Sequence, residues 1–427
     1  MTRVAYSNLA YRPVLFVAVL LAVGCGTGGP PEPTWWKGNL HTHSYWSDGD
    51  DYPEMVVAWY KDHGYNFLAL TEHNVIADGE KWIEVDTNSQ RMDAYSKYVG
   101  KFGEEWVDDE DHDAVLQVRL RTLDEFRGLF EVPHEFLLIR SEEITDEFED
   151  APVHLNAINL LDLVQPLGGE SISGVLQNTV SAVLEQRDRT GHPMLVQVNH
   201  PNFGWALTPE DLVALDGEQF FEVYNGHPDV HNQGDDVRVS TERMWDIVLA
   251  ERLSSGGDVM YGVAVDDAHS YHEFTSSHAN PGRGWVMVQS EELTPEAIVA
   301  AMEDGEFYSS TGVSLADISF AEGTLSLEIV AEEGVNYSTQ FIGTPRGYDA
   351  TKTLIEDEIL SSPRYRYSDE IGAVLAEESG RTASYTVHGH ELYVRAKVLS
   401  TREKANPNYA GEVEVAWTQP FLLRQTR

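Results

Sequence analysis

Through residue 312 the chain alternates between short, continuous apolar runs and longer amphipathic segments. Continuous runs are typical of buried parallel strands, whereas half-buried strands alternate residue by residue. The runs predict seven strands, at 39–42, 66–71, 136–141, 194–199, 220–225, 259–265 and 285–290. The amphipathic segments predict helices at 52–64, 174–191, 242–256 and 294–305. The last three helices end at glycine, a common helix stop, and the alternation predicts an α/β barrel.

Two parts of the chain depart from this alternation. Residues 75–135 form an insertion too long for a plain loop, and its acidic run at 104–113 predicts a solvated surface. After residue 312 short alternating segments take over and predict a small β-sandwich over 313–427. His388 and His390 lie at a predicted hairpin turn with no other candidate ligand nearby, so we interpret them as solvated.

The N-terminus has the pattern of an export signal. Basic residues flank an apolar stretch at 14–23 that is too short to span a bilayer stably. Small residues follow up to Cys25, the one cysteine of the chain, which excludes disulfides within it. Residues 1–25 resemble a bacterial lipoprotein signal with Cys25 as the lipidated residue; an unlipidated secretory signal is the alternative. Residues 26–36 predict a flexible tether, so we expect a membrane-anchored protein outside the cytoplasm.

The length of the chain bears on the number of domains, and its net charge limits which partners are expected. A chain of 427 residues exceeds the size of one core, so two domains are expected. There are 71 acidic and 29 basic residues, a formal net charge of -42. Such a surface repels nucleic acid, so we expect no polynucleotide partner. It also slows anionic substrates unless bound metal ions compensate. Solubility alone would equally explain most of these carboxylates, and the oligomeric state stays open.

Imidazoles and carboxylates gather where the predicted strands end. His41 and His43 are one residue apart, so within a strand both side chains would face the same side. The further candidates are Asp48, His73, Glu142, Glu143, His154, His200, Asp267 and His269. In an α/β barrel the carboxyl ends of the strands meet at one mouth, where active sites form. Burying so many polar groups unpaired would cost roughly several kcal/mol each. The mixture, without thiolates, predicts a site for zinc, iron or manganese.

The series His-Thr-His, Ser-Asp-Gly, Thr-Glu-His-Asn, Glu-Glu, Asn-His-Pro and Asp-Asp-Ala-His resembles the polymerase-and-histidinol-phosphatase (PHP) superfamily. It is most similar to secreted or membrane-tethered metallohydrolases related to carbaryl hydrolase. The resemblance covers about 39–312 and implies a distorted (β/α)7, TIM-like barrel over 37–312.

The resemblance implies two or three divalent metal ions, which would be zinc, manganese or iron. The first ion would be held by His41, His43 and Asp267. Glu143 would bridge it to a second ion, completed by His154 and His200. The third would be held by Asp48, His73 and His269. Asp48 stands where many family members have histidine, Glu72 replaces the commoner aspartate, and Glu142 is interpreted as a mere neighbour of Glu143.

The expected reaction is metal-assisted hydrolysis of an ester in a small molecule. Two ions about 3.5–4 Å apart share a water and lower its pKa, so a bridging hydroxide is the expected nucleophile. Catalysis would depend on Glu143, Asp267 and His200. No Gly-x-Ser-x-Gly motif or phosphate-binding glycine loop is found.

The substrate class stays open between three alternatives. A phosphoester is the first expectation, and a carboxylic or carbamate ester is the alternative. A non-catalytic binding module stabilised by metal is a second alternative. Arg283, Asn225 and His227 lie near predicted strand ends and are candidates to orient the substrate, with ordinary loop structure as the competing interpretation.

Overall fold

The computed structural model describes residues 33–86, 89–355 and 363–423. The predicted signal peptide and Cys25 lie outside these ranges. In the described ranges, no helix has the length and apolar character needed to cross a membrane. Strand β1 (Thr34–Asn39) includes residues 34–36, so the last residues of the predicted tether belong to a strand.

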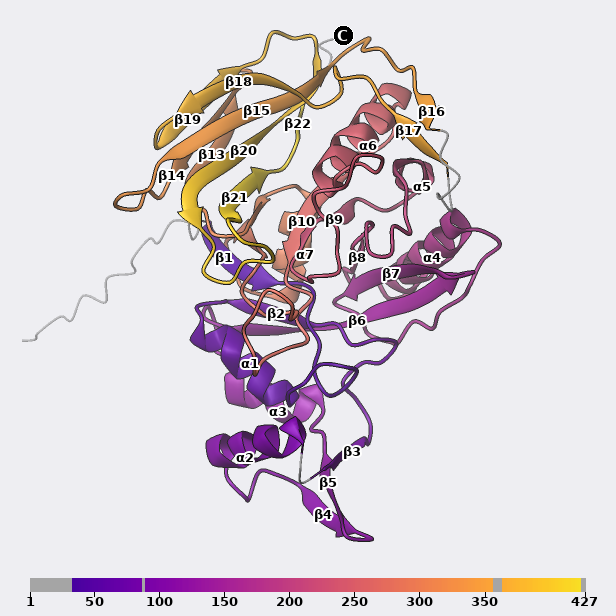
Figure 1. Cartoon of the computed structure of the whole chain (residues 1–427), viewed down its shortest axis with the longest axis vertical. Helices are drawn as coiled ribbons and strands as arrows, with labels where there is room; N and C mark the ends of the chain where they lie inside the picture. Colours follow the sequence, from indigo (N-terminus) through magenta and orange to yellow (C-terminus); the bar gives the residue numbers. More distant parts are fainter. Residues whose placement is uncertain (1–32, 87–88, 356–362, 424–427) are drawn as a thin grey trace, which may run out of the picture. The chain divides into compact units, whose positions relative to one another are not determined.

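One large sheet contains strands from before and after residue 312 (Figure 1). Its first strands are β1, β2 (Phe67–Leu70), β6 (Leu137–Phe148), β7 (Ala151–Ile158), β8 (Leu195–Val198), β9 (Phe220–Asn225), β10 (Tyr261–Val265), β11 (Trp285–Ser290) and β12 (Phe307–Ser310). β1, β2 and β6 are parallel, as are β8, β9 and β10. β7 separates these groups and is antiparallel to both neighbours. The fold is therefore mixed α/β with a partly parallel sheet.

Over the described residues, the expected closed seven-stranded barrel is not observed. The sequence pattern missed β7, and both β7 and β11 run antiparallel to their neighbours, which breaks the parallel order. β10 lies at the edge of the sheet, and side chains of Ser309 in β12 and Gln419 after β21 form hydrogen bonds with its main chain. Ser309 Oγ accepts from the Ala264 N–H at 2.9 Å and donates to the Gly262 carbonyl at 2.8 Å. The Gln419 amide bonds the N–H and carbonyl of Gly262 at 3.0 and 2.9 Å.

Most predicted elements are confirmed, but two strand boundaries are wrong. β1 ends at Asn39, so His41 and His43 follow a strand instead of lying in one. β6 continues to Phe148, well past the predicted end at 141, because it pairs along its whole second half with β7. The strands predicted at 66–71, 194–199, 220–225, 259–265 and 285–290 correspond to β2, β8, β9, β10 and β11.

The four predicted helices are present as α1 (Pro53–Asp62), α4 (Ile172–Thr190), α6 (Thr241–Ser255) and α7 (Pro295–Glu303). A short helix, α5 (Pro209–Ala214), lies between α4 and α6 in the chain. The hydroxyls of Ser171 and Ser240 cap α4 and α6 at their first turns. Gly191 and Gly256 end them with φ of 68° and 81°, a left-handed conformation that glycine adopts without strain.

The insertion at 75–135 folds as a small unit against α1. It contains β3 (Trp82–Val85), α2 (Gln90–Phe102), β4 (Asp109–His112), β5 (Val115–Arg119) and α3 (Leu123–Phe130), with strand order β3-β5-β4. Tyr98 and Phe126 pack in the same apolar cluster as Tyr60 of α1. All four residues of β4 are exposed, which confirms that the acidic run faces solvent.

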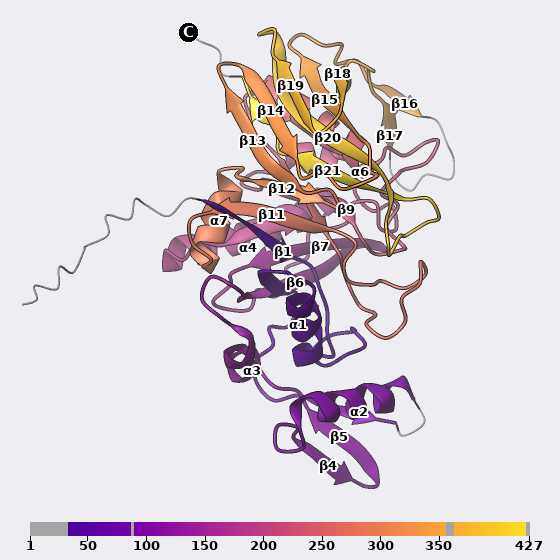
Figure 2. The ribbon, with the colours of Figure 1, turned by 90° about the vertical axis from the view of Figure 1, so that its left-hand side faces the viewer.

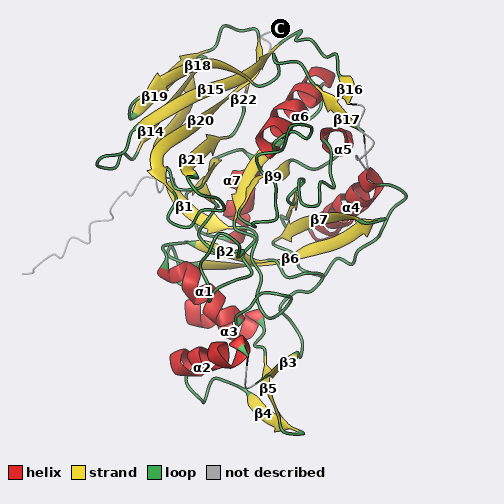
Figure 3. Ribbon diagram, viewed as in Figure 1, coloured by secondary structure: helices red, strands yellow, loops and turns green. Residues whose placement is uncertain are grey.

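The described residues after β12 form strands without helices (Figure 3). These strands are β13 (Leu315–Ala321), β14 (Thr324–Ile329), β15 (Tyr337–Pro345), β16 (Thr353–Ile355), β17 (Arg364–Arg366), β18 (Ala373–Ser379), β19 (Thr382–Thr386), β20 (Glu391–Glu403), β21 (Val413–Thr418) and β22 (Phe421–Leu422). The sheet β13-β14-β19 lies beside β15 and β20 (Figure 2). The two layers share an apolar core that includes Leu325, Phe341 and Val394. The larger layer continues into the central sheet, in the order β11-β12-β21-β20-β15-β18, so a separate β-sandwich stays a prediction.

Candidate metal centre

Main-chain hydrogen bonds hold the segment after β1 beside the segment after β10. The His41 N–H donates to Asn39 Oδ1 at 2.9 Å, which bends the chain as it leaves the strand. The Asp267 N–H donates to the His41 carbonyl at 3.0 Å, and the His43 N–H donates to the Ala268 carbonyl at 3.0 Å. Residues more than two hundred positions apart are thereby fixed in register, with their side chains converging on one site.

All nine predicted ligands lie in four overlapping groups, in each of which the candidate ligand atoms are within 4.8 Å of one another. These groups are His43, Asp48, His73 and His269; His41, His43 and Asp267; His41, Glu143 and His200; and His73, Glu143 and His154. The second group matches the residues expected for the first ion, and the first group contains the three expected for the third ion together with His43. The trio expected for the second ion is divided, because His200 groups with His41 whereas His154 groups with His73.

Glu143 lies at the centre of these groups, fully buried in the middle of β6. Its Oε2 is 3.5 Å from Nε2 of both His41 and His43. Its Oε1 is 3.1 Å from His154 Nδ1 and 3.4 Å from His200 Nε2. Oε2 also lies 2.8 Å from His73 Nδ1. The two oxygens of one carboxylate therefore face different sets of imidazoles, which is the geometry that a bridging ligand requires.

Within the described chain, two buried nitrogens of this centre, His41 Nε2 and His43 Nε2, have no hydrogen-bond partner, and both face Glu143 Oε2. Asp267 Oδ1 lies 3.2 and 3.3 Å from the two imidazole nitrogens. Unpartnered buried polar atoms are rare, because losing water costs them free energy. A divalent cation would satisfy all of these lone pairs at once. The donor set of imidazole and carboxylate without thiolate fits zinc, manganese or iron.

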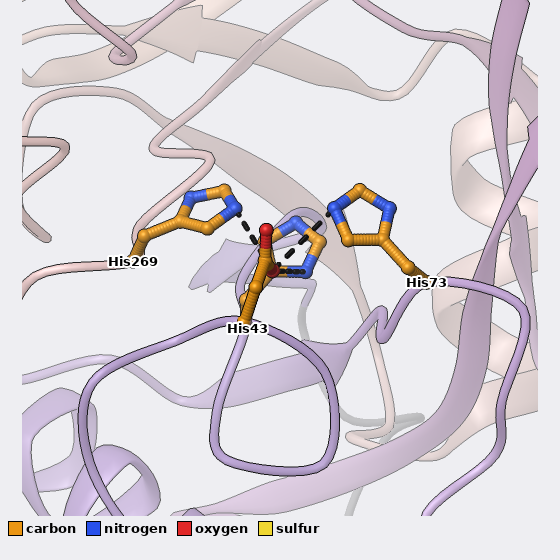
Figure 4. Close-up of side chains that lie close together, drawn as sticks. His43, His73 and His269 are labelled. Atoms are coloured by element: carbon orange, nitrogen blue, oxygen red, sulfur yellow. Dashed lines mark ion pairs between the residues drawn. The ribbon is translucent and has the colours of Figure 1, made fainter.

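Asp48 reaches the centre from the turn at 45–48, of which it is the exposed residue. Its Oδ1 is 3.3 Å from His269 Nε2, 3.5 Å from His73 Nε2 and 3.8 Å from His43 Nδ1. Figure 4 shows the rings of His73 and His269 pointing toward each other from two sides of His43. The Asp48 side chain is 58% exposed, whereas that of His43 is fully buried. Partial burial would raise the pKa of Asp48, but the imidazoles of His269, His73 and His43 lower it.

Glu222 is a supporting residue that the sequence interpretation missed. Its Oε1 lies 2.6 Å from His41 Nδ1, and its Oε2 accepts from the His200 N–H at 2.7 Å and from Asn225 Nδ2 at 2.8 Å. A carboxylate on one ring nitrogen fixes the tautomer that leaves the other free for a metal ion. The available signal was one acidic residue within the otherwise apolar start of 220–225, where every residue is buried.

Glu72 holds the loop that carries His43. It accepts from the N–H and hydroxyl of Ser44 at 3.1 and 2.5 Å, and also from the Ser47 hydroxyl. Ser47 Oγ in turn lies 3.2 Å from His43 Nδ1. Glu72 therefore acts on the His43 ring through Ser47 and holds the adjoining main chain through Ser44.

The charges of the centre shift its pKa values in opposite directions. Burial lowers the pKa of His41, but Asp267, Glu222 and Glu143 together raise it well above the ordinary value. Burial and the neighbouring His269 lower the pKa of His43 to about 3. A neutral His43 keeps the lone pair that a metal ligand needs.

Two of the three predicted substrate residues are buried. Arg283 is fully buried and donates to main-chain carbonyls, including that of Gly226 at 2.8 Å. Asn225 is buried as well, and its Nδ2 donates to Asp267 Oδ2 at 3.1 Å, so it supports a predicted ligand. Both side chains therefore form hydrogen bonds inside the protein, and their role in orienting the substrate stays a prediction.

His227 does line a cavity of about 320 Å³ beside the candidate ligands. The rest of the wall beyond these ligands consists of Phe203, Pro228, Asp229, Ser270, Ser277, His278 and Ala279. None of the described residues that line it is lysine or arginine. The cavity reaches Asp48, His73, Glu143 and Asp267, so the candidate metal centre is accessible to a small molecule.

No protein-family model and no curated protein matches the chain. One similar solved structure is a two-domain protein from Bacteroides vulgatus that contains a predicted PHP-like metal-dependent phosphoesterase. The similarity covers 91% of this chain and 96% of that chain, with 16% identity and a TM-score of 0.38. A predicted metal-dependent phosphoesterase from Bifidobacterium adolescentis aligns with 56% of this chain and 89% of its own, with 14% identity and a TM-score of 0.28.

An amidohydrolase from Chromobacterium violaceum, solved with sulfate and without metal, aligns with 55% of this chain and 87% of its own, with 13% identity and a TM-score of 0.27. Because these TM-scores and identities are low, we base the functional assignment on the side chains of the site.

Proposed function

We propose that the protein is a metal-dependent hydrolase of the PHP type that cleaves a phosphoester in a small molecule. The observation that carries this proposal is the position of Glu143, whose two oxygens face separate sets of imidazoles. When bound, two or three divalent ions would supply an activated water and charge stabilisation for the developing anion.

The chain's own residues hold this site and shape the approach to it. Glu143 and Asp267 place carboxylate oxygens close to both His41 and His43, and these residues would hold a cation between them. His227 Nδ1 accepts from the Asp229 N–H at 3.1 Å, so the neutral ring carries its proton on Nε2. That N–H is free to donate to a substrate oxygen, and Phe203 gives the wall an apolar surface.

A cavity beside the ligands favours an enzyme over the metal-stabilised binding module. A structural metal site closes its coordination with protein groups, whereas a catalytic one keeps positions open. Glu143, Asp267, His200 and His154 all line the accessible cavity. A carboxylic or carbamate ester remains the second candidate substrate, because the wall has no lysine or arginine to pair with a phosphate.

The test is a substrate screen with the metal-reconstituted protein. Phosphomonoesters, phosphodiesters, aryl esters and carbamates are compared, each with Zn²⁺, Mn²⁺ or Fe²⁺ and after chelation. We expect metal-dependent turnover of a phosphoester that is abolished by chelation and by Glu143→Gln. Turnover of aryl esters or carbamates alone would transfer the assignment to the second candidate. Stoichiometric metal binding without turnover of any class would support the binding module.

We also propose that the protein acts outside the cytoplasm, held at a membrane by lipid on Cys25. The support is the apolar stretch at 14–23 and the small residues before the cysteine. Cys25→Ser should move the protein to the soluble fraction and abolish acyl labelling. Unchanged membrane partition of the variant would contradict the anchor.

A further inference from the structure

Arg283 ties together two loops that form the substrate side of the cavity. Its guanidinium is fully buried and donates to main-chain carbonyls, among them those of Gly226 at 2.8 Å, His278 at 2.7 Å and Thr275 at 2.9 Å. Gly226 directly precedes His227, and the segment 275–279 supplies Ser277, His278 and Ala279 to the cavity wall. One side chain therefore bridges the two loops that face the candidate ligands.

The main chain of Arg283 is itself anchored beside the metal centre. Asp266 Oδ1 accepts from the N–H groups of Arg283 at 2.6 Å and Gly284 at 2.8 Å. Its Oδ2 accepts from the Gly282 N–H at 2.8 Å and from the Tyr60 hydroxyl at 2.9 Å. Asp266 adjoins the predicted ligand Asp267, so the guanidinium extends from a point that is fixed relative to the ligands.

The loop between β20 and β21 completes this arrangement. Arg283 Nη2 donates to Asn406 Oδ1 at 3.2 Å, and Asn406 Nδ2 donates to the Pro281 carbonyl at 3.2 Å. The loop is held in turn by Glu412, which accepts from the Tyr224 hydroxyl at 2.9 Å and from Lys404 at 3.2 Å. The loop between these C-terminal strands thus contacts the residues behind the cavity wall. It contains none of the predicted metal ligands.

We infer that Arg283 is a positioning residue whose hydrogen bonds fix the two loops of the cavity wall on the substrate side. Asn406, in the C-terminal region, supports the same loops through its contact with Arg283. A guanidinium offers five donors in a rigid plane and can hold several carbonyls at fixed angles, which lysine cannot reproduce. The substrate role rests on the proposed function, whereas the placement of the loops does not.

The test compares Arg283→Lys and Asn406→Ala with a matched control, Arg252→Lys, all in the full chain. Arg252 is also a buried arginine that donates to carbonyls, those of Leu212, Leu215 and Glu218, but none of these residues lines the cavity. We measure hydrogen–deuterium exchange by mass spectrometry, bound metal per chain, and KM and kcat with bis(4-nitrophenyl) phosphate.

For Arg283→Lys we expect faster exchange at 226–229 and 275–280, unchanged metal content, and a KM raised roughly tenfold to hundredfold. Asn406→Ala should shift the same peptides and KM in the same direction by less. Arg252→Lys should affect exchange near 212–220 and leave KM unchanged.

Unchanged exchange in both loops, or looser loops with an unchanged KM, would overturn the inference. A KM that rises equally in Arg252→Lys would show only a general loss of stability and would overturn it as well. If no ester probe is turned over by the unaltered protein, the proposed function fails. The exchange comparison then decides the placement of the loops by itself.

Discussion

Glu222 Oε1 lies 2.6 Å from Nδ1 of His41, and both side chains are fully buried. The carboxylate therefore orients a predicted metal ligand that has no contact with solvent. Because Glu222 also accepts from the N–H of His200, it aligns two predicted ligands from a strand that contributes none itself.

Glu222→Gln should weaken metal binding while the fold is kept. The amide preserves the shape but removes the charge that makes the imidazole a strong ligand, so the affinity should fall about 10- to 100-fold. Competition with a chromophoric chelator measures it. Glu218→Gln is the matched control, because Glu218 is buried in the same region but contacts the Phe220 N–H. Equal affinities for the two variants would contradict the role of Glu222.

The adjacent glutamates of β6 should differ sharply in their effect. Glu143→Gln should lower bound metal and reduce ester turnover about a hundredfold or more, since the bridging charge is lost. Glu142→Gln should leave both unchanged, because neighbouring strand residues face opposite sides and Glu142 accepts from the Val164 N–H at 2.6 Å. If Glu142→Gln is the inactive variant, the assignment of the bridging residue is wrong.

Glu218 should make stability fall as pH rises. Burial raises the pKa of its carboxyl from 4.5 to about 8. Between these values the folded chain keeps the proton and the unfolded chain releases it, so the free energy of unfolding decreases with pH in this window. The contribution is complete below the lower value. Urea unfolding at pH 5 and pH 8 should show a smaller loss for Glu218→Gln than for the unaltered protein; equal losses would refute the assignment.

The second His-x-His pair should be dispensable for metal. His388 and His390 are exposed at the turn before β20, and their N–H groups donate to Glu391. Neither belongs to a candidate metal group in the described chain. Replacing both by alanine should leave metal content and turnover intact, as metal analysis and an ester assay would show. A loss of metal would mean that this turn binds an ion.

The sequence predicted correctly those strands that follow from a local run of apolar residues. His73 and His200 follow continuous apolar runs, and these runs do form β2 and β8. Glu143 was placed at a strand end but lies within β6, because β6 is prolonged by its pairing with β7. That pairing depends on tertiary contacts, and the short apolar run at 136–141 contains no sign of it.

The supporting residues were the least predictable part of the site. The role of Arg283 depends on Asn406, which is 123 positions away in the chain. Likewise, Glu222 acts on His41 at a separation of 181 positions. No periodicity relates such pairs, so the residues were interpreted by chemical type alone. Because Arg283 lies near a predicted strand end, it was interpreted as a substrate contact. In the structure its side chain is buried and donates to main-chain carbonyls.

The pairing of β12 with β21 determines how the protein unfolds. Tyr308, Ser309 and Ser310 pair with Thr418, Trp417 and Ala416, and Ser309 and Gln419 also secure the free edge of β10. A chain cut after residue 312 would expose two strand edges, and exposed edges recruit other chains into aggregates. Melting should therefore proceed as one cooperative transition that includes the metal-binding and C-terminal parts together, so neither part is an interchangeable module.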